Sequence, residues 1–400
     1  MTAAAPKPPR ADKRPVTSTW HGLTLVDDYA WLRADNWQEV MREPDKLDAG
    51  IRAHLEAENA HTEAVFADTR ALQEMLFQEM KGRIKEDDSS VPSPDGPWSY
   101  YTSFVTGGQY PRICRTPREG GPEQVLLDGN KEAQGKPYWQ LGGTAHSPDH
   151  KLMAYAVDDK GSEAATVRFR ELATGNDLPD EIPNVRSALV WALDSRTLFY
   201  VRLDDNYRPI EVWRHTVGTP VEQDVQVYAE ADSGFYVGVG QTQSGRYILI
   251  DVHDHQTSEV RVIDADAPAG EPRLVAARKT GHEYGVDHHG GDLVITTNRD
   301  GAEDFKICTA PLDSPGLANW REIVPHKPGR LILETVAFKQ HLVRLEREDG
   351  LPRIVIRHWD DGLEHAIAFP EEAYSLGLSS GYEYDTATIR FTYSSMTTPA

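Results

Sequence analysis

The sequence predicts an all-β protein, a β-propeller of seven blades whose seventh blade is incomplete. The main observation is a repeat of short apolar strands and tight turns that recurs at intervals of 40 to 49 residues. Four strands and three turns need about 40–50 residues, which is the length of a propeller blade. Seven repeats can be started, at Trp98, Tyr138, Ser187, Phe235, Tyr284, Leu331 and Ser375. The last is interrupted at Ala400, midway through a blade.

A leader and an arm precede the repeats. Residues 1–14 are polar and rich in proline and lack the apolar stretch of a secretory signal, so we expect a disordered leader. Residues 15–34 carry tryptophan and tyrosine among turn-forming residues. Because these large rings are costly to leave exposed, we expect an extended arm that packs on another surface.

A helical extension is predicted at 46–84. Asp48 is a possible N-cap, and Glu, Ala, Gln and Lys are frequent. Apolar side chains recur mostly at helical spacing, at Ile51, Leu55, Val65, Leu72, Met75, Leu76 and Met80. One helix or a helix pair would bury this face, and a propeller offers little room for it. The partner surface is therefore expected to belong to another domain.

The repeats themselves show strand and turn signals. In the second repeat, Ser147 and Asp149 frame a turn, residues 151–157 form an apolar inner strand, and residues 166–172 form the third strand. The fourth repeat has the same order, with a turn at 244–246 and strands at 247–252 and 258–264. The chain thus divides into a leader at 1–14, an arm with helices at 15–85 and a propeller at 86–400.

Composition excludes several classes of function. Asp and Glu number 63 against 42 Lys and Arg, so the net charge is −21, which disfavours nucleic acid and is compatible with basic peptides. Solubility alone can also account for this charge. No apolar run approaches the length of a membrane span, so no membrane association is expected. The two cysteines, Cys114 and Cys308, cannot form a disulfide framework, which indicates a reducing compartment and a cytoplasmic protein.

One serine matches a nucleophile motif. Ser379 lies in Gly377-Leu-Ser-Ser-Gly381, formally G-x-S-x-G, which requires a sharp turn from a strand into a helix. A further strand follows here, and His365, the last histidine, lies upstream instead of downstream. We therefore expect a blade turn and assign no nucleophile.

The histidines and acidic pairs are interpreted as structural. His253 and His255 would share one strand face, and a second cluster contains His282, His288 and His289, but neither has zinc-ligand spacing. The acidic pairs Asp204/Asp205 and Glu371/Glu372 are expected to be solvated. No glycine-rich loop has the lysine or helix that holds phosphates. No catalytic residue, metal ligand or cofactor is predicted, and the substrate-binding residues stay unassigned.

Several segments resemble oligopeptidase B, a branch of the prolyl oligopeptidase family of serine peptidases. They lie in one register over most of the chain: 21–32 (HGLTLVDDYAWL), Tyr110-Pro111, 178–180 (LPD), 207–220 (YRPIEVWRHTVGTP), 282–284 (HEY) with Asp287-His288, 297–299 (TNR) and 393–399 (YSSMTTP). The resemblance implies an N-terminal arm, a seven-bladed propeller and an α/β-hydrolase domain that would follow Pro399. That domain would carry the Ser, Asp and His triad, the oxyanion hole and an acidic pocket that selects Lys or Arg.

The resemblance also implies roles for the parts that are present. The arm and helices would pack on the hydrolase domain in cis, and the propeller would cover the active site and limit substrates to short peptides. Residues 1–400 alone are then expected to be inactive. One alternative is a stand-alone propeller that binds a peptide or protein without catalysis. Another is a metal- or cofactor-dependent enzyme within the propeller.

Overall fold

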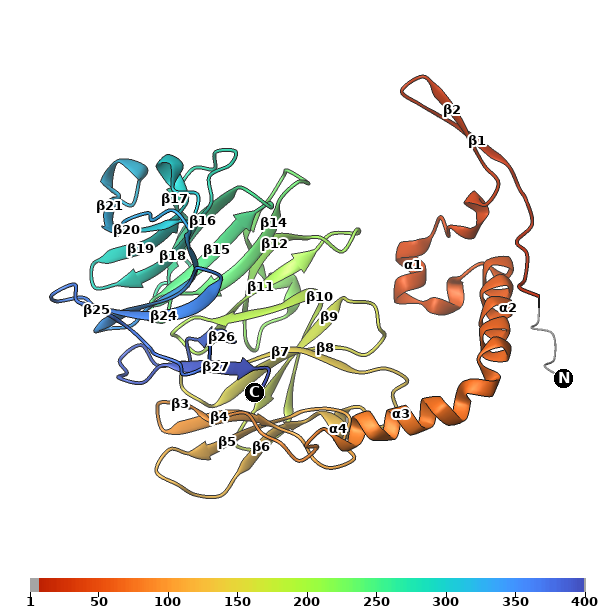
Figure 1. Ribbon diagram of the computed structural model, residues 1–400, viewed down its shortest axis with the longest axis horizontal. Coiled ribbons are helices and arrows are strands. Elements are labelled where there is room, and N and C mark those ends of the chain that lie inside the picture. Colours follow the sequence, from red (N-terminus) through yellow and green to blue (C-terminus); the bar gives the residue numbers. More distant parts are fainter. Residues whose placement is uncertain (1–6, 399–400) are drawn as a thin grey trace.

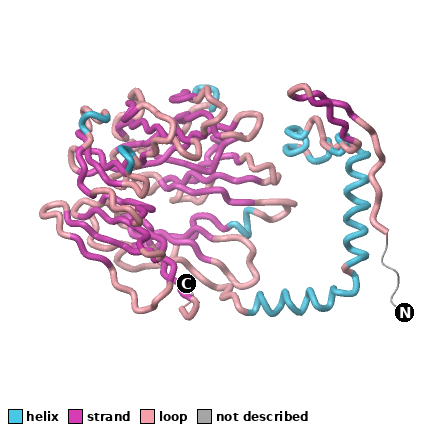
Figure 2. Tube along the Cα trace, turned by 45° about the horizontal axis from the view of Figure 1, so that its top comes forward, coloured by secondary structure: helices cyan, strands magenta, loops and turns pink. Residues whose placement is uncertain are grey.

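The computed structural model describes residues 7–398 and divides into a propeller body and an N-terminal extension beside it (Figures 1 and 2). Part of the predicted leader, residues 1–6, and the end of the seventh repeat, residues 399–400, lie outside the described residues. The extension contains the hairpin β1 (Val16–Trp20) and β2 (Leu23–Asp27), the short helix α1 (Trp37–Arg42), and the helices α2 (Ala49–Val65) and α3 (Arg70–Gly82).

The predicted helical region is a helix pair. The Asp48 carboxylate caps α2, because its Oδ1 accepts the N–H groups of Gly50 at 2.8 Å and Ile51 at 3.1 Å, which confirms the predicted N-cap. Helix α2 ends at Phe66, and a short 3-10 turn (Ala67–Thr69) separates it from α3. Figure 1 shows the two helices meeting at an angle between the arm and the first blade.

The apolar face of this extension is uncovered in residues 7–398. Ile51 is buried, but Leu72, Met75 and Met80 are 50–60% exposed. Trp20 and Leu23, at the tip of the β1–β2 hairpin, are 64% and 68% exposed. Figure 2 shows the extension standing away from the strands of the propeller. The predicted packing surface for the arm is therefore not provided by the described part of the propeller.

The propeller body consists of antiparallel sheets, and its first three blades occupy two of them. Blade 1 contains β3 (Ser93–Asp95), β4 (Trp98–Ser103), β5 (Arg112–Pro117) and β6 (Gln124–Asp128), followed by the single-turn helix α4 (Gly129–Glu132). Blades 2 and 3 share a seven-stranded sheet with β7 (Gln140–His146), β8 (Leu152–Asp158), β9 (Ala165–Glu171), β10 (Asp177–Trp191), β11 (Thr197–Leu203), β12 (Pro209–Thr216) and β13 (Val225–Ala229).

The remaining blades follow in order. Blade 4 contains β14 (Tyr236–Gln241), β15 (Tyr247–His253), β16 (Ser258–Asp264) and β17 (Arg273–Ala276). Blade 5 contains β18 (Tyr284–His289), β19 (Asp292–Thr297), β20 (Lys306–Pro311) and β21 (Arg321–Val324), and blade 6 contains β22 (Arg330–Ala337), β23 (His341–Glu348), β24 (Leu351–His358) and β25 (Glu364–Ala366). Blade 7 has two strands within residues 7–398, β26 (Tyr374–Ser379) and β27 (Arg390–Ser395).

The sevenfold repeat is confirmed, with two corrections to the predicted blade starts and one to the predicted inner strand. The first blade begins at Ser93, one strand before the predicted start at Trp98, because β3 has only three residues and gives a weak pattern. The third start point, Ser187, lies inside β10, a strand of fifteen residues that leaves blade 2 and continues as the first strand of blade 3. The segment 151–157 corresponds to β8, which is the second strand of its blade, while β7 takes the inner position.

Apolar clusters between neighbouring blades form the core. Between blades 3 and 4, for example, Phe199 and Val201 pack with Ile248 and Ile250, and all four are almost fully buried. Buried Arg side chains add polar links between blades. Arg170 of blade 2 donates to Glu132 at 3.0 Å and to the carbonyl oxygen of Leu126 at 3.3 Å, both at the end of blade 1.

The ring closes between blades 7 and 1 through side chains. The Arg390 guanidinium donates to the carbonyl oxygens of Val91, at 3.2 Å, and of Pro92. Arg118 of blade 1 forms an ion pair with Glu383. Within residues 7–398, β26 and β27 pair only with each other. None of the helices described is long and apolar enough to cross a membrane.

A buried histidine lies between two carboxylates where blades 2 and 3 meet. His215 is 1% exposed, and its Nδ1 lies 2.7 Å from Asp224, whose other oxygen accepts the hydroxyl of Tyr200 at 2.7 Å. The His215 Nε2 lies 3.5 Å from Asp180. Burial alone would lower the pKa of His215, but the two carboxylates outweigh it and raise the pKa above its ordinary value of 6.5.

This arrangement predicts pH-dependent stability. A histidine whose pKa is raised on folding stabilises the folded protein fully below about pH 6.5, and that stabilisation is lost as the pH rises through the folded pKa. We expect His215→Asn to lower the free energy of unfolding more at pH 6 than at pH 9. Urea unfolding followed by tryptophan fluorescence at both pH values measures this, with the exposed His255→Asn as control. An equal loss at both pH values would contradict the prediction.

Candidate functional site: the central channel

The first strands of the blades surround the central channel. Strands β7, β10 and β14 contact one another in sequence, as do β18 and β22. The chain passes from the extension into β3, and the first strands of the other blades run in the same direction. Each first strand therefore begins at the end of the channel nearest the extension. The turns that follow the first strands, such as Gly96-Pro97 after β3 and Gly290-Gly291 after β18, lie at the opposite end.

A groove of about 640 Å³ opens along blades 4 to 6, near the beginnings of β18 and β22. Its walls carry five carboxylates, Asp251, Asp254, Glu283, Asp287 and Glu334, together with apolar side chains from the same strands. Partial desolvation in the groove raises the pKa of Glu334. The groove thus combines negative charge with apolar surface, which suits a ligand with a cationic group on an apolar stem.

The first predicted histidine pair is separated in the structure. His253 ends β15 and lines the groove, with its Nδ1 2.8 Å from Asp251, whose hydrogen bond raises the pKa of His253. His255 lies in the turn after the strand, so the prediction that the two share one strand face is wrong. The physical reason is that Asp254 accepts the N–H groups of Gln256 and Thr257 and turns the chain away from the strand.

The second histidine cluster has separate structural contacts. His282 hydrogen-bonds Thr297 at 2.9 Å, and His288 hydrogen-bonds Ser244 at 2.9 Å. His289 hydrogen-bonds the hydroxyl of Tyr384 at 3.0 Å, and its ring stacks on Trp359 at 4.1 Å between centroids. These contacts support a structural role for each of the three rings.

Two of the four paired acids have structural contacts. Asp204 accepts the N–H groups of Asn206 and Arg208 in a turn, and Asp205 is exposed. Glu371 was expected to be solvated, but the hydroxyls of Ser395, Thr397 and Tyr393 hold it and lower its pKa to about 2. Its neighbour Glu372 is exposed.

The serine of the G-x-S-x-G motif lies in a β-hairpin. Ser379 ends β26 and pairs with Arg390 of β27, and the segment between them is a loop without a helix. This is the blade turn that the sequence predicts. The strand-to-helix elbow that would expose a nucleophile is therefore not formed at this position.

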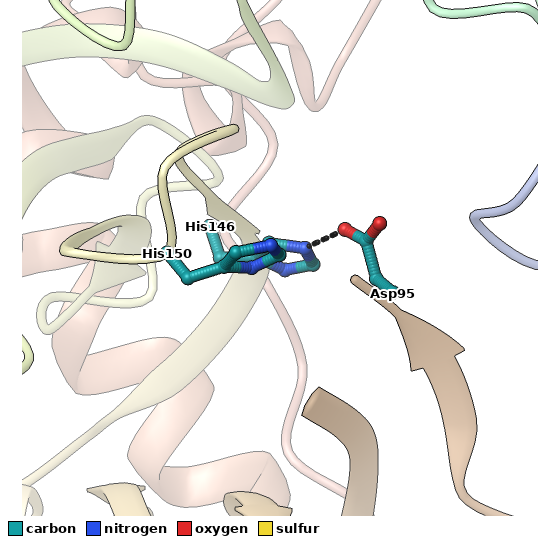
Figure 3. A group of neighbouring side chains, drawn as sticks. All are labelled: Asp95, His146 and His150. Atoms are coloured by element: carbon teal, nitrogen blue, oxygen red, sulfur yellow. Dashed lines mark hydrogen bonds and ion pairs between the residues drawn. The ribbon is translucent and has the colours of Figure 1, made fainter. Parts of the chain in front are cut away.

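Sequence reasoning missed one cluster of titratable side chains, at the junction of blades 1, 2 and 7. Asp95 ends β3, His146 ends β7, and His150 lies in the turn after β7 (Figure 3). Nε2 of His146 lies 2.7 Å from Oδ2 of Asp95, and Nδ1 of His150 lies 2.9 Å from the hydroxyl of Tyr100. The His146 ring stacks on Tyr100 at 3.8 Å, and Tyr382 of blade 7 meets it edge-on at 4.8 Å. Burial raises the pKa of Tyr100 to about 12 and lowers that of His150.

The donor set Asp95, His146 and His150 was tested as a metal site. The ligand atoms lie within 4.8 Å of one another, and imidazole with carboxylate suits several transition metals. However, the two imidazole planes are within 22° of parallel, so their in-plane lone pairs do not converge. Figure 3 shows the two rings nearly parallel and overlapping in the view, with Asp95 hydrogen-bonded to His146. The geometry fits a hydrogen-bonded aromatic stack that joins three blades better than it fits a metal centre.

Comparison with known proteins covers the whole described chain. Residues 8–400 match the family model described as the prolyl oligopeptidase N-terminal β-propeller domain. The chain is 40% identical to dipeptidyl aminopeptidase BI of Pseudoxanthomonas mexicana, over all of this chain and 56% of that protein. It is 30% identical to Protease 2 of Moraxella lacunata, over 98% of this chain and 56% of that protein. The chain thus spans about half the length of the curated relatives it matches.

Solved structures give the same result. Oligopeptidase B from Leishmania major superposes with a TM-score of 0.89 at 28% identity, over 98% of this chain and 58% of that one. The closed form of oligopeptidase B from Trypanosoma brucei, with covalently bound antipain, superposes with a TM-score of 0.88 at 29% identity, over 98% of this chain and 57% of that one.

Proposed function

Because this chain belongs to the prolyl oligopeptidase family of peptidases as an N-terminal β-propeller, we propose that it is the substrate-gating part of an oligopeptidase B-like serine endopeptidase. The intact enzyme would cleave short peptides after Lys or Arg, with its Ser, Asp and His triad on an α/β-hydrolase domain in cis. The observation that carries the proposal is the match of residues 8–400, which include the N-terminal arm, to the family's propeller domain.

The uncovered face of the extension supports the arrangement of domains. The apolar side chains of α2, α3 and the β1–β2 hairpin form a surface that residues 7–398 leave in water. A contiguous apolar surface of this kind marks an interaction site. We therefore assign residues 15–85 to packing on the hydrolase domain, residues 86–400 to the propeller and residues 1–14 to a leader.

The acidic groove supports the substrate class. Five carboxylates line the groove, which opens at the end of the channel nearest the extension, the side where the hydrolase domain would join. Together with the net charge of −21, they favour peptides with Lys or Arg side chains. Cys114 and Cys308 are free and buried, which agrees with a cytoplasmic enzyme that works in a reducing compartment.

A chimera tests the proposal. Residues 1–400 would replace the matching part of oligopeptidase B from Leishmania major, whose remaining segment would supply the hydrolase domain. We expect the chimera to cleave short peptides after Lys and Arg and to be blocked by a serine-reactive inhibitor. Residues 1–400 alone should show no hydrolysis above buffer, because the triad and oxyanion hole are expected in the other domain.

Two results would contradict the proposal. One is inhibitor-sensitive cleavage by residues 1–400 alone. The other is a folded chimera that cleaves no basic peptide while the unaltered relative, prepared in parallel, does. In the second case, binding of a peptide by the isolated chain with no turnover would favour the stand-alone binding propeller.

The groove makes a separate prediction about affinity. In the chimera, Glu334→Gln should raise KM for peptides with several basic residues about threefold to tenfold and leave kcat nearly unchanged. The reason is that it removes one partly desolvated ion pair, worth about 1 kcal/mol, made equally in the ground and transition states. Steady-state kinetics measure this, with Glu271→Gln, exposed before β17, as control. A fall in kcat with no change in KM would contradict the assignment.

A further inference from the structure

The longest connection at the far end of the channel is the loop 380–389 between β26 and β27. The corresponding turns of the other blades span from two residues, as at Gly290-Gly291, to five, as at 147–151. The loop begins with Ser380 and Gly381, and Gly381 has a positive φ of 65°, which redirects the chain as it leaves the strand. Its contacts show that it lies over the mouth of the channel.

One contact spans the ring. The side-chain amide of Gln243, in the turn after β14 of blade 4, donates to the carbonyl oxygens of Ser380 at 3.3 Å and Glu383 at 3.1 Å. Blade 4 lies across the ring from blade 7, three blades away in one direction and four in the other. These bonds therefore bridge the channel opening.

Further contacts fix the loop to blades 5 and 6. The Tyr384 hydroxyl hydrogen-bonds Nδ1 of His289, in blade 5, at 3.0 Å. The Tyr384 carbonyl oxygen accepts the N–H group of Lys339, after β22 of blade 6, at 3.1 Å. The Lys339 ammonium lies 2.6 Å from the carboxylate of Asp385.

The opposite side of the loop contacts blades 1 and 2. Tyr382 meets the rings of Tyr100 and His146 edge-on, at centroid distances of 5.9 and 4.8 Å. Glu383 accepts from Nη2 of Arg118 at 3.1 Å. The loop is thus held by side chains or backbone groups from blades 1, 2, 4, 5 and 6, on both sides of the opening.

We propose that residues 380–389 form a plug that keeps this mouth of the channel closed, so that peptides enter the assembled enzyme by another route. The plug is held at five blades. The loss of any one contact therefore leaves the others to keep it across the opening. The part of the proposal that concerns peptide entry rests on the proposed peptidase function. The closure itself does not.

Cross-linking of residues 1–400 tests the closure. Gln243→Cys with Glu383→Cys should be joined in high yield by a short bismaleimide, read as a mass shift of the intact protein. The pair Gln256→Cys with Glu383→Cys is the control, because Gln256 lies in the β15–β16 turn at the other end of the channel. The native Cys114 and Cys308 are buried, and each single variant reports their background. A yield no higher than the control would overturn the plug.

The chimera tests the route. With the cross-link in place, we expect kcat/KM for a short basic peptide to stay within twofold of the uncross-linked variant. A loss of tenfold or more would overturn the proposal, since it would show that the loop must open for turnover. If the chimera is inactive before cross-linking, the proposed function fails, and the cross-linking yield of the isolated chain still decides whether the plug is closed.

Discussion

Replacing Glu346 by alanine is expected to lower the free energy of unfolding by about 3 kcal/mol, because it removes the buried carboxylate that accepts from Nε of the buried Arg344. Glu346 lies on β23 and its side chain is 1% exposed. Its Oε2 accepts from Nε of Arg344, itself buried, at 2.7 Å, and lies 3.8 Å from Nε of Arg330. Its Oε1 lies 3.2 Å from Nη2 of Arg353. Three guanidinium groups therefore meet at this carboxylate, and two of them have a second partner, Glu364 for Arg344 and Glu348 for Arg353.

Urea unfolding followed by tryptophan fluorescence measures this loss, with the exposed Glu372→Ala as control. The double variant Arg344→Met with Glu346→Leu should recover part of the lost stability, because it replaces the closest buried ion pair with apolar groups of similar volume while Glu364 keeps Arg357 as a partner. A change of less than about 1 kcal/mol in Glu346→Ala would show that water reaches this cluster and solvates the arginines.

The propeller was predictable because its signal is local and repeated. Alternating apolar residues and turn-forming residues place the first strands of blades 4 to 7 within one residue of their predicted starts. The errors occur where a strand is unusual. Strand β3 is too short to show a pattern, and β10 continues through a register shift between Ile182 and Val185, where Asn184 adopts a positive φ of 59°. A bulge of this kind is not visible in apolar periodicity.

The contacts around the channel could not be predicted, since ring closure brings together residues that are far apart in sequence. Asp95 and His146 are 51 residues apart, and Gln243 and Glu383 are 140 residues apart. The turn that contains Ser147 and Asp149 was predicted. The ring contacts beside it, of His146 and His150 with Tyr100 and of His146 with Tyr382, depend on where blades 1 and 7 meet. Sequence reasoning identified the turns correctly and had no means of pairing them across the ring.

The second large effect is expected at Asp287, a carboxylate that joins three consecutive blades. Asp287 lies on β18 of blade 5, and its Oδ1 accepts the N–H groups of Gln243 of blade 4 and of its own neighbour His288, each at 2.8 Å. Its Oδ2 accepts the N–H group of Ala337 of blade 6 at 2.8 Å. Burial raises the pKa of Asp287 although the three donors act in the opposite direction.

Replacing Asp287 by alanine should lower the free energy of unfolding by about 3 kcal/mol or more, because up to three backbone N–H groups lose their acceptor in a partly buried site. Asp287→Asn should lower the free energy of unfolding by about half as much. Its single side-chain oxygen can accept from only one side of the junction, and its amide NH₂ would face a backbone N–H group on the other side. Urea unfolding measures both, with Asp292→Asn on the neighbouring strand β19 as control. Equal stability of Asp287→Asn and the unaltered chain would contradict the bridging role.

The same carboxylate also holds the contacts of the plug in place. Gln243, which bonds the loop 380–389, and Ala337, two residues before Lys339, are the two positions that Asp287 ties to blade 5. If these bonds set the width of the channel mouth, Asp287→Asn should reduce the cross-linking yield between Gln243→Cys and Glu383→Cys at urea concentrations where the protein is still folded. A variant that is less stable yet cross-links as well as the parent would show that the loop is held by its own contacts, and that Asp287 serves blade packing alone.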